Sequence, residues 1–176
     1  MPTPLIPKPL DAAAFAPFGT VIRFEAAQAR PVNENTARRA DTAALFEQAS
    51  GLAPVLAIYR AEPQALPTRL RLFERHPHAA QSFVSLNVPR FLVVVAPADR
   101  DGLPDPARAQ AFVGQAGMGL SYRPDQWHTP LLAIGTGGDL LMFMAEGSAT
   151  DCVEHRLAES LLIQNPLTPE STNHGA

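Results

Sequence analysis

The sequence is poor in cysteine, lysine and charge. Its only cysteine, Cys152, cannot form an internal disulfide or a zinc site built on several thiolates, so we expect a reducing, cytoplasmic setting. Only 18% of the 176 residues are charged, the formal net charge is -3, and the 14 basic residues include a single lysine, Lys8. Because no basic field is available for a phosphate backbone, we expect no nucleic-acid partner.

Long apolar runs are missing as well. No stretch approaches the roughly 20 consecutive apolar residues that span a bilayer, so we expect no membrane association. The hydrophobic content of 46% is nevertheless sufficient for a substantial core in a chain of this length. The sequence therefore predicts one domain over residues 1–164, followed by a disordered tail over residues 165–176.

Proline and glycine, in contrast, are frequent and spread along the chain. With 18 prolines and 11 glycines, long helices are interrupted almost everywhere, which favours a mostly β fold with a few short helices. The run Phe91–Ala96 is apolar throughout, which is typical of a central strand covered on both faces. Helical segments are predicted at residues 11–15, 43–49 and 105–112, strands at 18–24, 55–60, 70–75, 82–86, 91–96, 131–134 and 139–144, and irregular structure at 25–40.

Three of the five histidines fall in or beside the predicted strands. His76 and His78 would lie on the same side of a continuous strand, which is a spacing that suits two metal ligands. Gln81 or Glu74 could add an oxygen, and His128 could arrive from a neighbouring strand. The alternative is that Pro77 ends the strand, which would leave His78 in a solvated turn and His76 as a hydrogen-bonded histidine without a metal.

Aromatic side chains accompany His128. Tyr122 and Trp127 combine an apolar ring with a hydrogen-bonding tip, and such residues often line ligand pockets, although both are also ordinary core residues. The sequence therefore predicts one polar small-molecule site formed by the two segments 74–78 and 122–128.

Two resemblances extend this interpretation. A strand-borne His76-x-His78 with a later Pro124-x-x-x-His128 is similar to the two metal-site motifs of the cupin superfamily. A narrower set of motifs resembles the ureidoglycolate lyase family in order and spacing: Phe15-x-x-Phe18-Gly19-x-Val21-Ile22, Arg60-Ala61-x-Pro63-x-x-Leu66-Pro67, Glu74-Arg75-His76-Pro77 with Gln81-x-Phe83, Val93–Ala96, Tyr122, and Trp127-His128-x-Pro130.

The resemblance implies a cupin-like β-barrel, usually a homodimer, that cleaves (S)-ureidoglycolate into glyoxylate and urea in allantoin breakdown and is associated with nickel. Cleavage of this hemiaminal needs a base for the carbinol proton and an acid for the departing urea nitrogen. We expect His76 and His128 as the catalytic or metal-binding pair, with Glu74 as an orienting group or acid. The full expected metal set is His76, His78, Gln81 and His128.

The substrate carboxylate calls for a planar cation, because a guanidinium can bind it through two hydrogen bonds. Arg75, Arg60 and Arg38 are the expected donors, with Arg123 as a further candidate, and Arg38 and Arg123 are equally well read as surface residues. Gln81, Tyr122 and Trp127 are expected as other substrate contacts.

Three positions depart from the family pattern. Thr129 stands where a second histidine is usual, Ser121 stands where an asparagine is usual, and Met144-Ala145-Glu146-Gly147 replaces a segment that commonly contains Asp-Arg-Gly. These departures keep two alternatives open: a cupin-like enzyme for another small hydroxy or oxo acid, and a non-catalytic barrel that binds a small acid.

Overall fold

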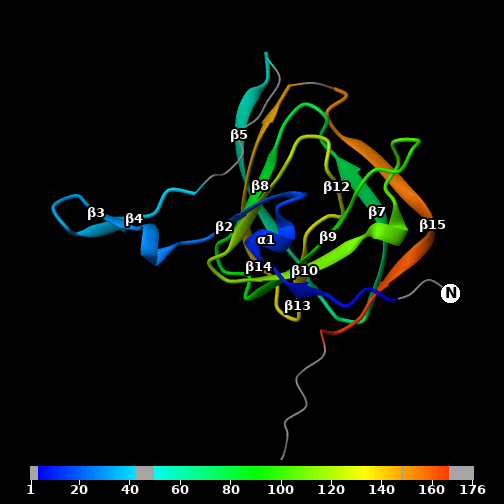
Figure 1. Ribbon diagram of the computed structural model, residues 1–176, viewed down its shortest axis with the longest axis horizontal. Helices are drawn as coiled ribbons and strands as arrows, with labels where there is room; N and C mark the ends of the chain where they lie inside the picture. The colour runs from blue at the N-terminus through cyan, green and yellow to red at the C-terminus, as the bar shows by residue number, and fades with distance from the viewer. Residues whose placement is uncertain (1–3, 43–49, 148, 167–176) are drawn as a thin grey trace, which may run out of the picture.

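The computed structural model describes residues 4–42, 50–147 and 149–166, and these residues form two main β-sheets with very little helix (Figure 1). The mostly β class predicted from the sequence is therefore confirmed. The expected helix at 43–49 and the tail beyond Pro166 lie outside the described residues. None of the described helices is long and apolar enough to cross a membrane.

The larger sheet has eight strands. Its main path runs β1 (Lys8–Pro9), β10 (Gln110–Gln115), β9 (Arg90–Ala96), β12 (Trp127–His128), β7 (Thr68–Arg75) and β15 (Val153–Ile163), while β13 (Leu132–Ile134) pairs with β9 and with β6 (Pro63–Gln64).

The second sheet has five strands in the order β2 (Gly19–Ile22), β11 (Gly119–Tyr122), β8 (Gln81–Ser85), β14 (Gly138–Glu146) and β5 (Ala53–Ala61). Neither sheet closes on itself in the described part of the chain, so the cupin-like barrel, which is a finer expectation than the β class, is not confirmed.

Strand β9 connects the two parts of the core. Phe91, Val93 and Val95 face the second sheet, where they pack with residues such as Phe83 and Leu120. The intervening Leu92, Val94 and Ala96 belong to a second apolar cluster with Phe73, Trp127 and Ile163. Because successive side chains of a strand point to opposite faces, an all-apolar strand can serve both clusters. The predicted central, doubly covered strand at 91–96 is confirmed.

The short helices follow the predicted caps. Asp11 accepts hydrogen bonds from the backbone N–H groups of Ala13 and Ala14 at the start of α1 (Ala12–Phe15). Asp105 caps a single 3-10 turn, η2 (Pro106–Arg108). The prediction that this helix continues to residue 112 was wrong, because Ala111 and Phe112 are buried in β10, where they pair with Val94 and Val93 of β9. Strand pairing overrides the local helical signal there.

The strands near the C-terminal end were predicted in part. The segments expected as strands at 131–134 and 139–144 are strands, and β13 and β14 pair in different sheets. Strand β15 was not predicted from the sequence. The apolar pattern of β15 is obscured by an irregularity between Arg156 and Leu161, where the register with β7 shifts.

Residues 25–40 were expected to be irregular, but much of this stretch has regular structure. They contain η1 (Ala26–Gln28) and a hairpin of β3 (Arg30–Val32) with β4 (Ala37–Arg39), joined through Asn33, Glu34 and Asn35, all with positive φ. We call residues 23–41 the arm, because this segment projects from the body of the two main sheets (Figure 1).

Candidate functional site

A cavity of about 520 Å³ is formed between strands of the two main sheets. Its lining combines apolar side chains with a group of carboxylates and one buried histidine, which is the usual composition of a small-molecule site. The lining residues are Tyr59, Arg60, Ala61, Glu74, His76, Gln81, Phe83, Pro130, Leu131, Leu140, Met144, Glu146, Gly147, Ala149, Asp151 and Cys152.

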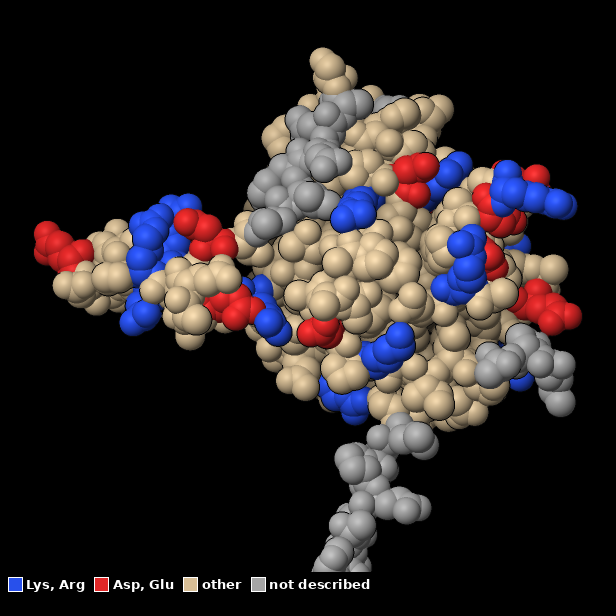
Figure 2. All heavy atoms as spheres, viewed as in Figure 1, with Lys and Arg blue, Asp and Glu red and all other residues tan. Residues whose placement is uncertain are grey.

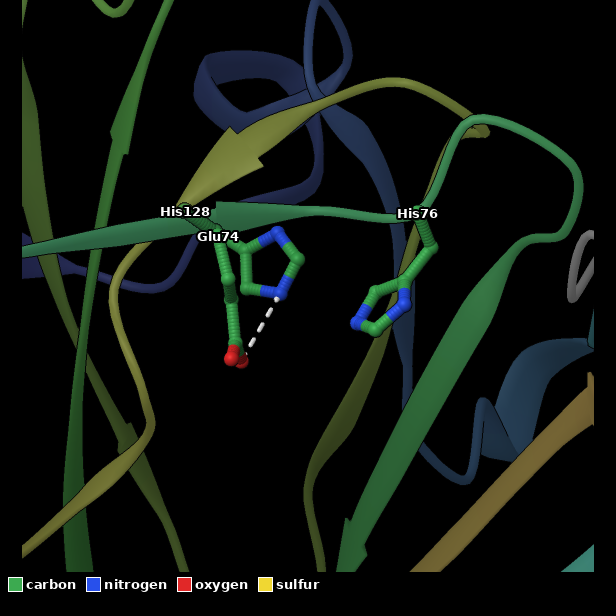
Figure 3. Close-up of side chains that lie close together, drawn as sticks. All are labelled: Glu74, His76 and His128. Carbon is green, nitrogen blue, oxygen red and sulfur yellow. Dashed lines mark ion pairs between the residues drawn. The ribbon is translucent and has the colours of Figure 1, made fainter. Parts of the chain in front are cut away.

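Glu74, His76 and His128 converge on one point beside this cavity (Figure 3). Glu74 lies opposite His128 in the pairing of β7 with β12, so the two side chains share one face of the sheet. His76 follows two residues later and points to the same side. Their ligand atoms all lie within 4.8 Å of one another, so the three residues form a candidate metal-binding group.

Backbone carbonyl groups set the orientation of both imidazole rings. His76 Nδ1 lies 2.8 Å from the carbonyl oxygen of Asp151, and His128 Nδ1 lies 2.8 Å from that of Gln126. Because a carbonyl oxygen only accepts, each Nδ1 carries a proton and donates it. Nε2 of each ring is thereby directed toward the shared space.

The two Nε2 atoms have different surroundings. His76 Nε2 is buried and has no hydrogen-bond partner among the described residues. His128 Nε2 lies 3.4 Å from Glu74 Oε1 and 3.1 Å from Gln81 Oε1. Both of these neighbours are oxygen acceptors, so the arrangement is satisfied by a proton on His128 or by a cation between the groups.

The surroundings lower the pKa values of both Glu74 and His76. Burial alone would raise the pKa of Glu74, but the hydrogen bond with His128 and the charges of His128 and His76 outweigh burial and lower it. Burial and the neighbouring charge of His128 lower the pKa of His76. At neutral pH the site therefore contains a charged Glu74 carboxylate beside a neutral His76 ring.

Tyr122 lies behind His128. Its ring stacks on the imidazole with centroids 3.9 Å apart and planes 13° apart, which fixes the plane of His128. The Tyr122 hydroxyl is buried without a partner in the described residues, and burial together with the charge of Glu74 raises its pKa. Tyr122 does not line the cavity, whereas Gln81 does.

Comparison with known proteins decides the family. A model of the family described as ureidoglycolate lyase matches residues 2–164. The chain belongs to the ureidoglycolate lyase family. Ureidoglycolate lyases of Burkholderia cepacia and Burkholderia mallei (strain NCTC 10229) are 40% and 37% identical to it, covering 82% and 88% of this chain and 81% and 89% of theirs. The ureidoglycolate lyase of Rhizobium etli (strain CIAT 652) is 35% identical, over 94% of this chain and 99% of that protein.

His78 does not join the site of this family member. Pro77 and His78 form a turn after β7, the His78 N–H donates to Asp151 Oδ1, and the His78 ring faces Thr150. Of the expected metal set of His76, His78, Gln81 and His128, only His78 is directed away: Glu74 converges with His76 and His128, and Gln81 Oε1 lies 3.1 Å from His128 Nε2. The alternative in which Pro77 ends the strand is the one that the structure adopts.

Arg75 and Trp127 lie behind the site. Arg75 points away from Glu74 and His76, stacks on Trp127 at 4.6 Å from the ring centroid, and pairs with Asp125 at 3.1 Å. Trp127 Nε1 donates to the carbonyl oxygen of Gly102. Neither residue is among those that line the cavity, and the contacts of both support β7 and β12.

The other predicted arginines also lie outside the cavity interior. Arg60 is at the rim, and strand alternation places its side chain on the same face of β5 as Ile58, where it makes two hydrogen bonds to Asp139. Arg38 is in the arm and donates to the carbonyl oxygen of Ala29. Arg123 is exposed and donates to the carbonyl oxygen of Pro17.

Ala149, Asp151 and Cys152 also line the cavity and were not predicted as site residues. Asp151 is 5% exposed; its backbone orients His76, its Oδ1 accepts from the His78 N–H, and its buried Oδ2 has no partner among the described residues. Nothing local in the sequence marks Asp151, because it lies 75 positions from His76.

Of the positions that depart from the family pattern, Glu146 lies at the cavity, and Ser121 and Thr129 are buried. Glu146 lines the cavity, so a carboxylate is present near the end of β14. Ser121 shares a buried hydrogen bond with Ser82, and Thr129 is buried next to His128.

Proposed function

We propose that this protein cleaves (S)-ureidoglycolate into glyoxylate and urea at the cavity beside Glu74, His76 and His128. Membership of the ureidoglycolate lyase family supports the substrate and the reaction. The observation that carries the proposal is the convergence of a charged carboxylate and two imidazole Nε2 atoms, which is a set of groups that can bind an oxygen-rich substrate and move protons.

The reaction requires one proton to leave and one to arrive. The carbinol O–H bond breaks and its electrons form the aldehyde C=O, while the C–N bond breaks and the urea nitrogen receives a proton. No net proton is gained or lost. A group that accepts the first proton can therefore return it to the nitrogen, and the charged Glu74 carboxylate and the neutral His76 Nε2 are the acceptors that the site offers.

The residues fit a divalent metal ion as the alternative to this proton-accepting role, because an ion would use the same lone pairs. Two imidazoles and one carboxylate form a donor set typical of first-row transition metals, and the buried Nε2 of His76 has no competing partner among the described residues. Glu74, His76 and His128 would hold the ion, which is nickel if the family association applies. When bound, it would polarise the hydroxyl and carboxylate oxygens of the substrate as a Lewis acid. The carbonyls of Asp151 and Gln126 orient the two rings for this role.

An activity assay tests this proposal. Purified protein supplied with (S)-ureidoglycolate and nickel should release glyoxylate, and removal of metal with a chelator should reduce the rate until nickel is restored. Replacement of His128 with Ala should lower kcat/KM by about 100-fold or more, because it removes a group that contacts the reacting centre.

A matched histidine provides the control. His155 lies against Trp127, away from the cavity lining, so the His155→Ala variant should retain the wild-type rate. Absence of glyoxylate release from the wild-type protein, with and without nickel, would refute the proposed activity. Unchanged turnover in the His128→Ala variant would refute the role of His128.

We also infer that the protein is a cytoplasmic homodimer. The single cysteine favours a reducing compartment. Among the described residues, β5 pairs only with β14, and its outer face carries Leu56 and Ile58, which are 66% and 58% exposed. A second copy related by a two-fold axis could cover this apolar edge on both chains at once. Sedimentation of a monomer at micromolar concentration would contradict the inference.

A further inference from the structure

We propose that the arm of one copy of the chain completes the cavity of a second copy, and that Arg38 of that arm binds the substrate carboxylate. This inference rests on the proposed function and on the proposed dimer. Its support comes from the charge of the cavity, from the state of the arm, and from the position of the cavity rim.

Among the described residues, the cavity has no cation that is free to bind the substrate carboxylate. Glu74, Glu146 and Asp151 line it, and Arg60 is the only lysine or arginine among the described lining residues. The Arg60 guanidinium already makes two hydrogen bonds to Asp139, at 2.8 and 3.1 Å, on the outer face of β5. A substrate that carries a carboxylate would meet an acidic cavity without a free guanidinium. A metal ion at Glu74 could bind one end of the substrate, but it would not neutralise Glu146 at the rim.

The arm, in turn, is not held to the described body of its own chain by polar side-chain contacts. The side-chain hydrogen bonds and ion pairs of residues 23–41 with other described residues all stay within that stretch. Strands β3 and β4 have three residues each, and an isolated two-stranded hairpin is marginally stable in water. The arm therefore has the properties of a segment that another surface stabilises.

Arg38 is the arginine that the arm leaves available. Arg23 pairs with Glu25, and Arg30 and Arg39 both pair with Asp41. Arg38 instead donates to the carbonyl oxygen of Ala29 and pairs with none of the described carboxylates. Figure 2 shows basic and acidic side chains side by side on the projecting arm, away from the body of its own chain. The charge of Arg38 complements the carboxylates of the cavity.

The rim lies beside the proposed dimer surface. Tyr59 and Arg60 belong to both the rim and β5, within four residues of the exposed Leu56 and Ile58. A second copy docked on this edge would sit next to the cavity opening. Two-fold symmetry then makes the contribution reciprocal, so that each arm would serve the cavity of the other chain.

A cross-linking experiment tests the placement without relying on activity. Cys152 is the only cysteine and lies at the cavity, so an Arg38→Cys variant treated with a short bismaleimide should give a covalent dimer on a denaturing gel. An Arg38→Cys variant that also carries Cys152→Ser should give no such dimer. Arg100→Cys, at another exposed arginine, should give none either. Only monomers from Arg38→Cys, in protein with the wild-type melting temperature, would overturn the proposal.

Kinetics test the role of the charge. Arg38→Ala should raise KM by about 10- to 100-fold with kcat nearly unchanged, because one charge-assisted contact to the bound substrate is lost. Arg30→Ala, which removes an arm arginine already paired with Asp41, should keep the wild-type KM. Equal effects of the two substitutions would overturn a specific role for Arg38.

Mixed dimers decide whether the contribution crosses between chains. Chains carrying Glu74→Gln and chains carrying Arg38→Ala are co-expressed with different tags, and the heterodimer is purified. If the arm acts on the other copy, one of the two sites is intact and about half of the wild-type activity returns at low substrate concentration. If the arm acts on its own copy, the rate at low substrate concentration stays at or below that of the Arg38→Ala homodimer and the proposal is wrong. If the wild-type protein does not cleave ureidoglycolate, the proposed function fails, while the cross-link still tests the placement of the arm.

Discussion

At the scale of single residues, two backbone carbonyl groups determine how the histidines are presented. The carbonyl oxygens of Asp151 and Gln126 hold the Nδ1 protons of His76 and His128, and so both Nε2 atoms face Glu74. Tyr122 then fixes the plane of His128 by stacking. The chemistry of the site depends on these supporting contacts as much as on the identity of the three converging side chains.

The lowered pKa of His76 predicts how the stability of the metal-free protein depends on pH. The folded-state pKa lies below the value of the unfolded chain, because burial and the charge of His128 disfavour the charged ring. The unfolded state therefore binds protons more readily between the two values, and stability falls as pH drops from the unfolded pKa toward the folded one. In urea denaturation at pH 7, 6 and 5, the His76→Asn variant should lose less stability on acidification than the wild type.

Glu74 contributes at lower pH. Its folded-state pKa is lowered, so its stabilising effect is present above the unfolded pKa and is lost as pH falls through the folded value.

The control for the His76→Asn experiment is His155→Asn, because His155 lies outside the cavity lining. An identical pH dependence of stability in the wild type and in His76→Asn would contradict the lowered pKa of His76.

Much of the residue-level site was predictable. Glu74, His76 and His128 were identified because carboxylates and imidazoles are the side chains that bind metals and move protons near neutral pH. Asp151 was not, because its role depends on a contact with His76 across 75 positions. The direction of Arg75 was not predicted, although it follows Glu74 directly and strand alternation turns it to the opposite face.

At the scale of elements, strand β9 and its neighbour β10 show how closely the core is packed. Gly114 in β10 lies against the ring of Phe91, and a Cβ atom built at Gly114 would come within 2.1 Å of that ring. Phe91 is almost fully buried between the sheets, so it has little space to move. The glycine is therefore required by packing, not by its backbone conformation.

A Gly114→Ala substitution tests this packing. The added methyl group should force Phe91 or the backbone to shift and should lower the free energy of unfolding by about 1–3 kcal/mol. Chemical denaturation of the two proteins measures the difference. The neighbouring Gln115→Ala, at an exposed position, should change stability by no more than about 0.5 kcal/mol. A Gly114→Ala variant as stable as the wild type would show that the core is looser than the contacts indicate.

The elements were predicted where the pattern was local. Phe91–Ala96 and the cap at Asp11 carry their own signals, in an apolar run and in a side-chain acceptor. Two features carry no such local signal: the end of the helix after Pro106, and the long strand β15. Pairing of β10 with β9 and of β15 with β7 determines them. Propensity is a weak guide where tertiary pairing provides more hydrogen bonds and more buried surface.

At the scale of the whole molecule, the exposed edge at β5 is the feature that favours association. Replacement of both Leu56 and Ile58 with Lys should weaken the proposed dimer by about 100-fold or more, since each chain would lose two buried apolar side chains. The melting temperature of the dissociated chain should change little, because both positions are largely exposed. Analytical ultracentrifugation over a concentration series measures the dissociation constant.

The control for this experiment is another exposed leucine. Leu103 is 42% exposed in the loop after β9, so a Leu103→Lys variant should keep the wild-type association state. A dimer that still forms after the double substitution at β5 would show that the interface lies elsewhere. The proposed position of the arm relative to the cavity would then be wrong as well.

The sequence by itself determined the mostly β class, the central strand and the residue types of the site. Each of these follows from local information: the spacing of proline and glycine, the alternation of apolar and polar residues, and the chemistry of histidine and glutamate side chains. The tertiary structure alone decided that His78 turns away from His76 and His128, that Asp151 orients His76, and that Arg75 and Trp127 lie behind the site. These outcomes depend on strand register and on which face each strand buries, and both are set by contacts between residues far apart in the chain.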